Sequence, residues 1–173
     1  MFTTILVAND GSDHGRNATR IAGDLAGRYG ARLFVTHVVS SQPVPEQLRR
    51  MAEVEHLVKD AEPEQGSSLG RLSVKASPNA REQQLKAAIS TKVLEQGVAL
   101  AKREGATDVQ PLELQGEAAE ALVEAVGRHA VDLVVIGSRG FGPIGRLLHG
   151  SVSTEVSQQV RCPCLLVKHA DNT

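Results

Sequence analysis

Aromatic residues are scarce in this chain, which has no Trp, one Tyr and three Phe. Proteins that bind single-stranded nucleic acid stack bases on aromatic side chains, and this sequence offers no such platform. An excess charge of one sign is also missing, because 19 Lys and Arg against 20 Asp and Glu give a formal net charge of −1. Non-specific nucleic-acid binding needs an excess of cations, so we expect no nucleic-acid partner.

Cysteines and long apolar runs are few as well. Cys162 and Cys164 stand one residue apart, which is too close for an unstrained disulfide loop. No apolar run is long enough to span a bilayer, and the N-terminal segment MFTTILVAND lacks the basic start of a signal peptide. We therefore expect a cytoplasmic protein, reduced at its cysteines, with no membrane partner.

Short apolar runs alternate with segments of helical periodicity along most of the chain. Strands are predicted over residues 3–8, 33–39, 107–114, 131–136 and 164–167, and helices over residues 13–29, 81–104, 116–126 and 151–160. This alternation predicts one α/β domain over residues 1–173, with an open, mostly parallel sheet and helices on both faces. Pro111 disturbs the third strand and suggests a bulge or an edge position.

The segment from about residue 40 to 80 has a different composition. Leu48, Met51, Ala52 and Val58 fit one amphipathic helix. Residues from about 60 to 79 are polar and rich in Gly and Pro, and we interpret them as a mobile loop or insertion without a function of its own.

The glycine-rich segment of residues 134–152, VVIGSRGFGPIGRLLHGSV, carries the main functional signal. A predicted strand that ends at glycines and leads into a helix is how α/β proteins hold phosphate groups. The string G-x-G-x-x-G at residues 140–145 follows the fourth predicted strand instead of the first, which argues against a dinucleotide fingerprint. The string GRLLHGS at residues 145–151 lacks the lysine of a P-loop.

A wider spacing does fit a phosphate site, namely Gly137-x2-Gly140-x9-Gly150-Ser151. Asp10 follows the first predicted strand and is suited to bind a ribose hydroxyl or a metal ion. If the first and fourth strands are neighbours, all these residues meet at the switch point of the sheet. His37 and His149 are more typical of packed or solvated residues than of a catalytic base, and we assign no catalytic residue.

Four segments of the sequence carry a resemblance to a known protein family. They are ILVANDGS at residues 5–12, THVV at 36–39, GEAAEALVEAV at 116–126, and DLVVIGSRG...LLHGSVS...CPCLLVK within 132–168. With them, the sequence resembles the universal stress protein family, of the ATP-binding type. The resemblance implies an adenine nucleotide alpha hydrolase-like fold with strand order 3-2-1-4-5. It also implies a homodimer through the last strand, Cys164 to Val167, and ATP, with or without Mg, at the carboxyl edge of the sheet.

The resemblance also implies roles for single residues. Asp10 would lie by the ribose or phosphates and meet any Mg through the nucleotide, while Val38 would contact adenine through its backbone. Asn9 departs from the family pattern, in which that position is often apolar or Thr. The phosphate-binding residues would be Gly137, Gly140, Gly150 and Ser151, with further contacts from Val152 and Ser153. The other pocket-lining residues would be Ala8, Asn9, Ile136 and Arg139.

These observations favour a dimeric stress or regulatory protein whose state depends on bound ATP. Hydrolysis would be slow at most, because no P-loop lysine, general base or arginine finger is evident. Two alternatives stay open at this point. One is an interaction module of the same fold that uses no nucleotide, and the other is a protein that binds AMP or cyclic AMP instead of ATP.

Overall fold

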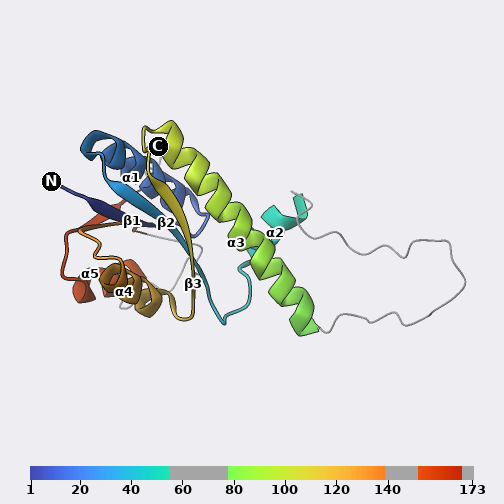
Figure 1. Ribbon diagram of the computed structural model, residues 1–173. Coiled ribbons are helices and arrows are strands. Elements are labelled where there is room, and N and C mark those ends of the chain that lie inside the picture. The colour runs from blue at the N-terminus through green and yellow to red at the C-terminus, as the bar shows by residue number, and fades with distance from the viewer. Residues whose placement is uncertain (55–77, 139–151, 169–173) are drawn as a thin grey trace, which may run out of the picture.

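A computed structural model describes residues 1–54, 78–138 and 152–168 of the chain. Strands and helices alternate along these ranges, as Figure 1 shows. Their bounds are β1 Thr4–Ala8, α1 Asp13–Tyr29, β2 Arg32–Val39, α2 Glu46–Val54, α3 Pro78–Arg103, β3 Val109–Gln115, α4 Ala118–Arg128, β4 Leu133–Gly137, α5 Val152–Gln159 and β5 Cys164–Val167. All strand pairs are parallel and the order is β3-β2-β1-β4-β5, which confirms the predicted topology.

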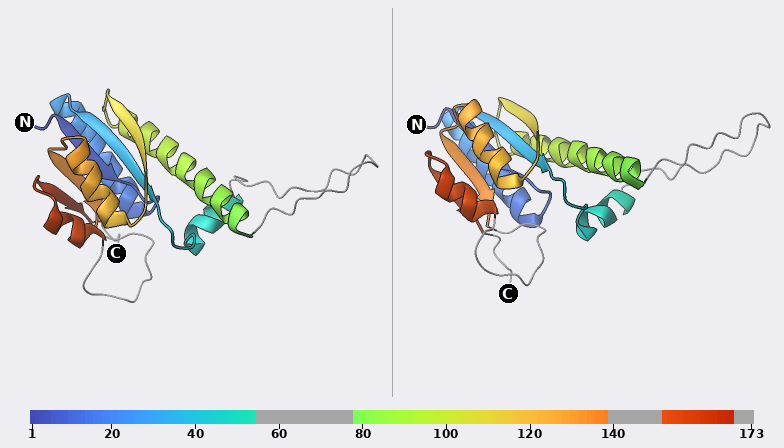
Figure 2. Two further views of the ribbon diagram at one scale, coloured as in Figure 1. Left: turned by 60° about the horizontal axis from the view of Figure 1, so that its bottom comes forward. Right: turned by 90° about the horizontal axis from the view of Figure 1, so that it is seen from below.

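The sheet is covered on both faces, with α1 and α3 on one side and α4 and α5 on the other (Figures 1 and 2). Successive side chains of a strand point to opposite faces. Ile5 and Val7 therefore pack against α1 and α3, while Leu6 between them packs against α4 and α5. Burial on both faces explains why the central strands are continuous apolar runs instead of alternating ones.

Helix α1 begins and ends at the residues that the sequence predicts. The Ser12 hydroxyl accepts a hydrogen bond from the Gly15 amide at 3.1 Å and caps the N-terminus. Gly30 adopts a left-handed conformation with φ of 63°, and its amide donates to the Ala26 carbonyl. A left-handed residue at this place favours glycine because a side chain would clash with the backbone.

Several predicted boundaries need correction. Pro78 and Asn79, which we expected in a loop, belong to the first turn of α3, where proline is tolerated because its missing amide needs no partner. Gly116 lies in the turn before α4 with φ of 115°, and the helix itself begins at Ala118. Pro111 lies on the edge strand β3, and the register with β2 continues unbroken past it, so the edge interpretation is confirmed and the bulge is not.

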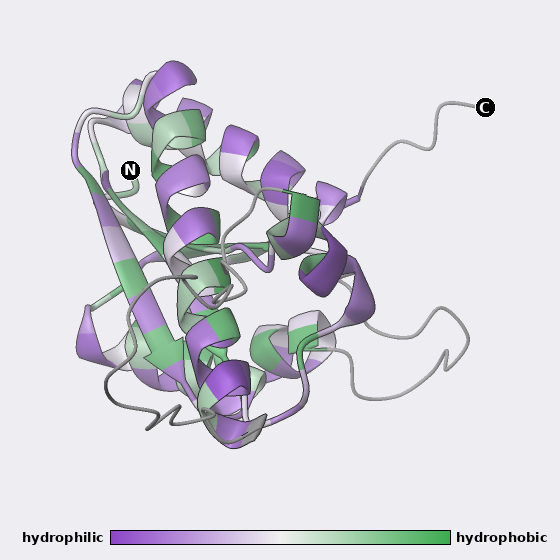
Figure 3. Ribbon diagram, turned by 90° about the vertical axis from the view of Figure 1, so that its right-hand side faces the viewer, coloured by the Kyte–Doolittle hydropathy of each residue, from purple (hydrophilic) through white to green (hydrophobic). Residues whose placement is uncertain are grey.

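Helix α2 and the first half of α3 form a small unit that projects beyond the sheet (Figures 1 and 2). Their hydrophobic side chains form a cluster of their own, made by Leu48, Ala52, Leu85, Ile89 and Val93. In Figure 3, hydrophobic and hydrophilic residues alternate along α3, as expected of a helix with one buried stripe. The predicted extension of the α2 helix to Val58, and most of the predicted loop after it, lie outside the described residues.

Cys162 and Cys164 are free thiols, half-buried against the cluster under α4 and α5. Burial raises the pKa of both thiols, which disfavours the reactive thiolate. Within the described ranges, no helix is both long and apolar enough to cross a membrane.

Asp132 joins the start of β4 to the start of β1. Its carboxylate accepts hydrogen bonds from the Thr3 amide at 2.8 Å, the Thr3 hydroxyl at 2.7 Å and the Thr4 amide at 3.2 Å. Burial alone would raise the pKa of Asp132, but these hydrogen bonds outweigh burial and lower it. The ionised carboxylate therefore stabilises the folded state.

We expect Asp132→Ala to lower the free energy of unfolding at pH 7 by about 1 kcal/mol. The expected loss is small because solvent screens the charge of this partly exposed carboxylate. The stabilisation is present above the unfolded-state pKa of ~3.9 and is lost as pH falls through the lower folded-state pKa. The difference from wild type should therefore shrink in acid. Urea unfolding at several pH values measures it, with Asp24→Ala, which removes an exposed ion pair to Arg28, as the control. Equal losses in the two variants at pH 7 would contradict the assignment.

Candidate functional site

The chemically interesting residues gather at the carboxyl edge of the sheet, where β1 and β4 end side by side. Ala8 at the end of β1 pairs with Ile136 of β4 on one side and with Thr36 of β2 on the other. The chain leaves β1 toward β2, whereas β4 lies on the opposite side of β1, so the strand order reverses between β1 and β4. Open α/β sheets bind ligands at such switch points. The prediction that the site residues meet at this switch point assumed that β1 and β4 are neighbours, and this is confirmed.

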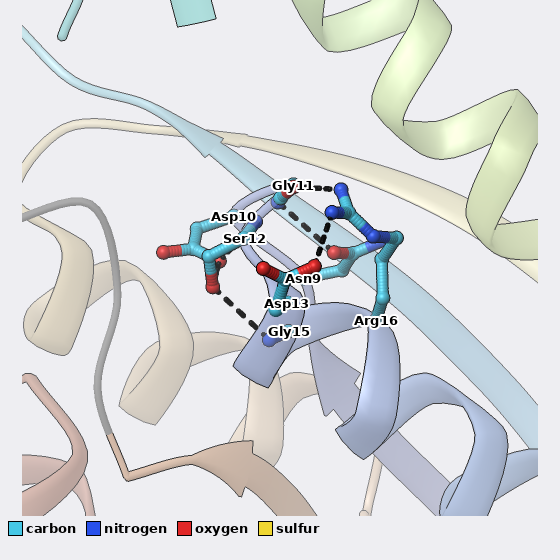
Figure 4. A network of polar contacts seen from close by, with 7 residues as sticks. All are labelled: Asn9, Asp10, Gly11, Ser12, Asp13, Gly15 and Arg16. Carbon is cyan, nitrogen blue, oxygen red and sulfur yellow. Dashed lines mark hydrogen bonds and ion pairs between the residues drawn. The ribbon is translucent and has the colours of Figure 1, made fainter. Parts of the chain in front are cut away.

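The loop of residues 9–12 connects β1 to α1 at this edge and is held by its own side chains (Figure 4). Oδ1 of Asp10 accepts hydrogen bonds from the Ser12 hydroxyl at 2.6 Å and the Ser12 amide at 3.0 Å. The Gly11 amide donates to Oδ1 of Asn9 at 3.0 Å. Arg16 of α1 donates to the Gly11 carbonyl and pairs with Asp13. The carboxylate of Asp10 is thus presented by a loop of fixed shape.

Asn9 is buried, with only 4% of its surface exposed. A methyl group at Gly15 would stand 2.9 Å from its Oδ1, and one at Gly97 of α3 would stand 2.9 Å from its Nδ2. The amide group therefore fills a narrow space between the start of α1 and α3. Its Oδ1, which accepts from the Gly11 amide, shapes the loop from inside the protein.

His37 is also buried at this edge, on β2 beside Asn9. Its Nδ1 lies 2.9 Å from the carbonyl oxygen of Asn9, and because a carbonyl only accepts, Nδ1 is the donor. Burial lowers the pKa of His37, while the bond to Asn9 and the carboxylates of Asp10 and Glu113 act in the opposite direction and offset only part of the effect. His37 is therefore a packed, uncharged residue at neutral pH, one of the two interpretations that its sequence position allows.

Of the other predicted site residues, some lie on described elements and some lie outside the described residues. Val38 is half-buried on β2, where its side chain packs toward α4, and Gly137 is the last residue of β4. Val152 and Ser153 are the first residues of α5, with Val152 exposed and Ser153 buried. Arg139, Gly140, Gly150 and Ser151 lie outside the described residues, so their places in the site stay predictions.

In residues 1–54, 78–138 and 152–168, no group of three His, Cys, Asp or Glu side chains lies close enough together to hold a metal ion by itself. The expected Mg at Asp10 is one that the nucleotide would bring, which does not require such a group.

The model of the universal stress protein family matches residues 1–168. The chain belongs to the universal stress protein family. Its structural neighbours share the adenine nucleotide alpha hydrolase-like fold.

Individual members of the family resemble the chain over nearly its full length. A universal stress protein of Thermus aquaticus is 36% identical over 168 residues, covering 97% of this chain and 100% of that protein. Universal stress protein YxiE of Bacillus subtilis is 31% identical, covering 97% of this chain and 100% of its own length. A universal stress protein solved in complex with cyclic AMP is 26% identical with a TM-score of 0.64, covering 96% of this chain and 97% of that one.

Proposed function

We propose that this universal stress protein binds an adenine nucleotide at the carboxyl edge between β1 and β4. The observation that carries the proposal is the pairing of Ala8 with Ile136 at the switch point of the sheet, where β1 ends and the loop of residues 9–12 begins. Helix α5 follows β4 along the chain, and the first backbone amides of a helix are suited to an anion. In the sequence, the glycine spacing lies between these two elements.

The residues at this edge fit such a ligand. Asp10 supplies a carboxylate on a loop of fixed shape, suited to ribose hydroxyls or to a Mg ion that the nucleotide brings. Gly137 allows close backbone approach at the end of β4. We propose ATP as the ligand, with Gly140, Gly150 and Ser151 around its phosphates and Val38 near adenine. Cyclic AMP is the second candidate, because a relative with 26% identity was solved with it.

We further propose that the protein works in the cytoplasm as a homodimer joined through β5, whose state depends on the nucleotide. Its role is binding and regulation, with slow hydrolysis at most, because the sequence offers no P-loop lysine. Free cysteines at half-buried positions are compatible with a reducing compartment. Leu165 and Leu166 on β5 are partly exposed at the edge of the sheet, which supports a partner strand there.

Gly140→Val should weaken nucleotide binding at least about tenfold, because a side chain at a phosphate-contacting glycine would keep the ligand from the backbone. Isothermal titration of the purified protein with ATP, AMP and cyclic AMP measures this. The matched control is Gly127→Val in α4, where a Cβ atom would meet nothing within 4 Å. The nucleotide proposal fails if the wild type binds none of the three ligands. Unchanged affinity in Gly140→Val would remove that glycine from the site.

A further inference from the structure

The side chain of His37 extends the hydrogen bonding between β1 and β2 beyond the last register pair of the two strands. The last register pair of β1 and β2 is Ala8 with Thr36. Beyond it, the Asn9 amide donates to the Thr36 carbonyl at 2.9 Å, and the Asn9 carbonyl accepts from Nδ1 of His37 at 2.9 Å. Both backbone groups of Asn9 are thus fixed by β2, the second of them through an imidazole ring.

The loop that begins at Asn9 depends on this attachment. Oδ1 of Asn9 accepts from the Gly11 amide, and the next residue, Asp10, accepts from Ser12 through its own side chain. Gly11 takes a left-handed conformation with φ of 85°, so the loop makes a sharp turn there. A rotation of the Asn9 peptide would carry Asp10 with it, because the two residues share that peptide group.

The surroundings of His37 suit a fixed donor and do not suit a group that reacts. His37 is 8% exposed, and its Nδ1 proton is donated to the Asn9 carbonyl. A buried carbonyl that lost this donor would keep an unsatisfied acceptor directly beside the loop. The same region has little space to adjust, since a Cβ atom at Gly97 of α3 would stand 2.7 Å from Cγ1 of Val35 and 2.9 Å from Nδ2 of Asn9.

We infer that His37 is a positioning residue for the nucleotide site: through its hydrogen bond to the Asn9 carbonyl it holds the loop of residues 9–12 in the shape that presents Asp10 to the ligand. The inference rests on the proposed nucleotide-binding function. His37 itself contacts Asn9, and it acts on the ligand only through that residue.

Asparagine and leucine at position 37 make a matched pair for the test. The two side chains have nearly the same shape, but the asparagine amide nitrogen occupies a place equivalent to Nδ1 and can donate, while leucine cannot. We expect His37→Leu to bind cyclic AMP and ATP about tenfold more weakly than His37→Asn, and His37→Asn to bind within about threefold of wild type. Isothermal titration gives the dissociation constants, and urea unfolding gives the stability of each variant.

A second measurement separates a positioning role from a merely structural one. Hydrogen exchange at the Gly11 and Ser12 amides should be faster in His37→Leu than in His37→Asn, because these amides are bonded inside the loop. Equal affinities in the two variants, or weaker binding without faster exchange in the loop, would overturn the inference. If the leucine variant does not fold, His37→Gln replaces it, since its amide extends beyond the Nδ1 position.

Failure of the two proposals can be told apart. A wild-type protein that binds no adenine nucleotide removes the proposed function and this role with it. A wild type that binds, together with leucine and asparagine variants that bind equally, removes only the role of His37.

Discussion

Replacing Gly23 by alanine is expected to lower the free energy of unfolding by about 1–3 kcal/mol. Gly23 is buried in α1 where this helix crosses α3. A Cβ atom there would lie 2.8 Å from the carbonyl oxygen and 2.9 Å from the Cα of Ala101, both backbone atoms. Backbone cannot rotate away as the end of a side chain can, so the two helices would have to separate and give up packing against the sheet.

Gly127 of α4 provides the control, because a Cβ atom there would meet nothing within 4 Å. In open space alanine favours a helix over glycine, so Gly127→Ala should be neutral or more stable by up to about 1 kcal/mol. Urea denaturation of both variants at one pH measures the difference. The close approach of α1 and α3 would be refuted if Gly23→Ala were as stable as Gly127→Ala.

Gly23 also shows which part of the fold the sequence could predict. The helical spacing of five apolar residues predicts an amphipathic helix here, and the structure confirms it for Ala18, Ile21, Ala22, Leu25 and Ala26. The need for glycine at position 23 arises only when Ala101, far along the chain, comes to lie against it. Local periodicity carries no information on which two helices meet, so this requirement could not be predicted from one sequence.

In the site, too, some features could be predicted from local sequence and others depend on contacts between distant residues. Asp10 and Gly137 follow or end apolar strands, so the carboxyl edge could be predicted for them without knowing any contact. The bond from His37 to Asn9 requires the register that pairs Ala8 with Thr36, because a shift of one residue would turn His37 to the opposite face of the sheet. The sequence identified both residues, but the register decides that they act together.

The homodimer proposed above would place the second copy at the exposed edge of β5. The central strands are covered on both faces, yet the neighbouring residues Leu165 and Leu166, which point to opposite faces, are 38% and 42% exposed. β5 is also the last strand of the sheet, so no strand within the described part of the chain pairs with its outer side. An apolar edge strand of this kind is a template for pairing with another chain, which supports the homodimer proposed above.

Leu166→Glu should therefore weaken self-association at least about 100-fold. In a two-fold symmetric dimer each substitution occurs twice. Burying one carboxylate should cost at least about 1.4 kcal/mol, which raises the dissociation constant of the dimer about tenfold for each copy. Sedimentation velocity over a concentration series measures the shift from dimer to monomer, and thermal unfolding checks that the monomer is folded. The control is Val54→Glu, which places the same charge on a residue that is 78% exposed in helix α2, part of the unit that projects beyond the sheet. Equal dissociation constants for the two variants would place the dimer interface elsewhere on the molecule, and a monomeric wild type would remove the dimer from the proposed function.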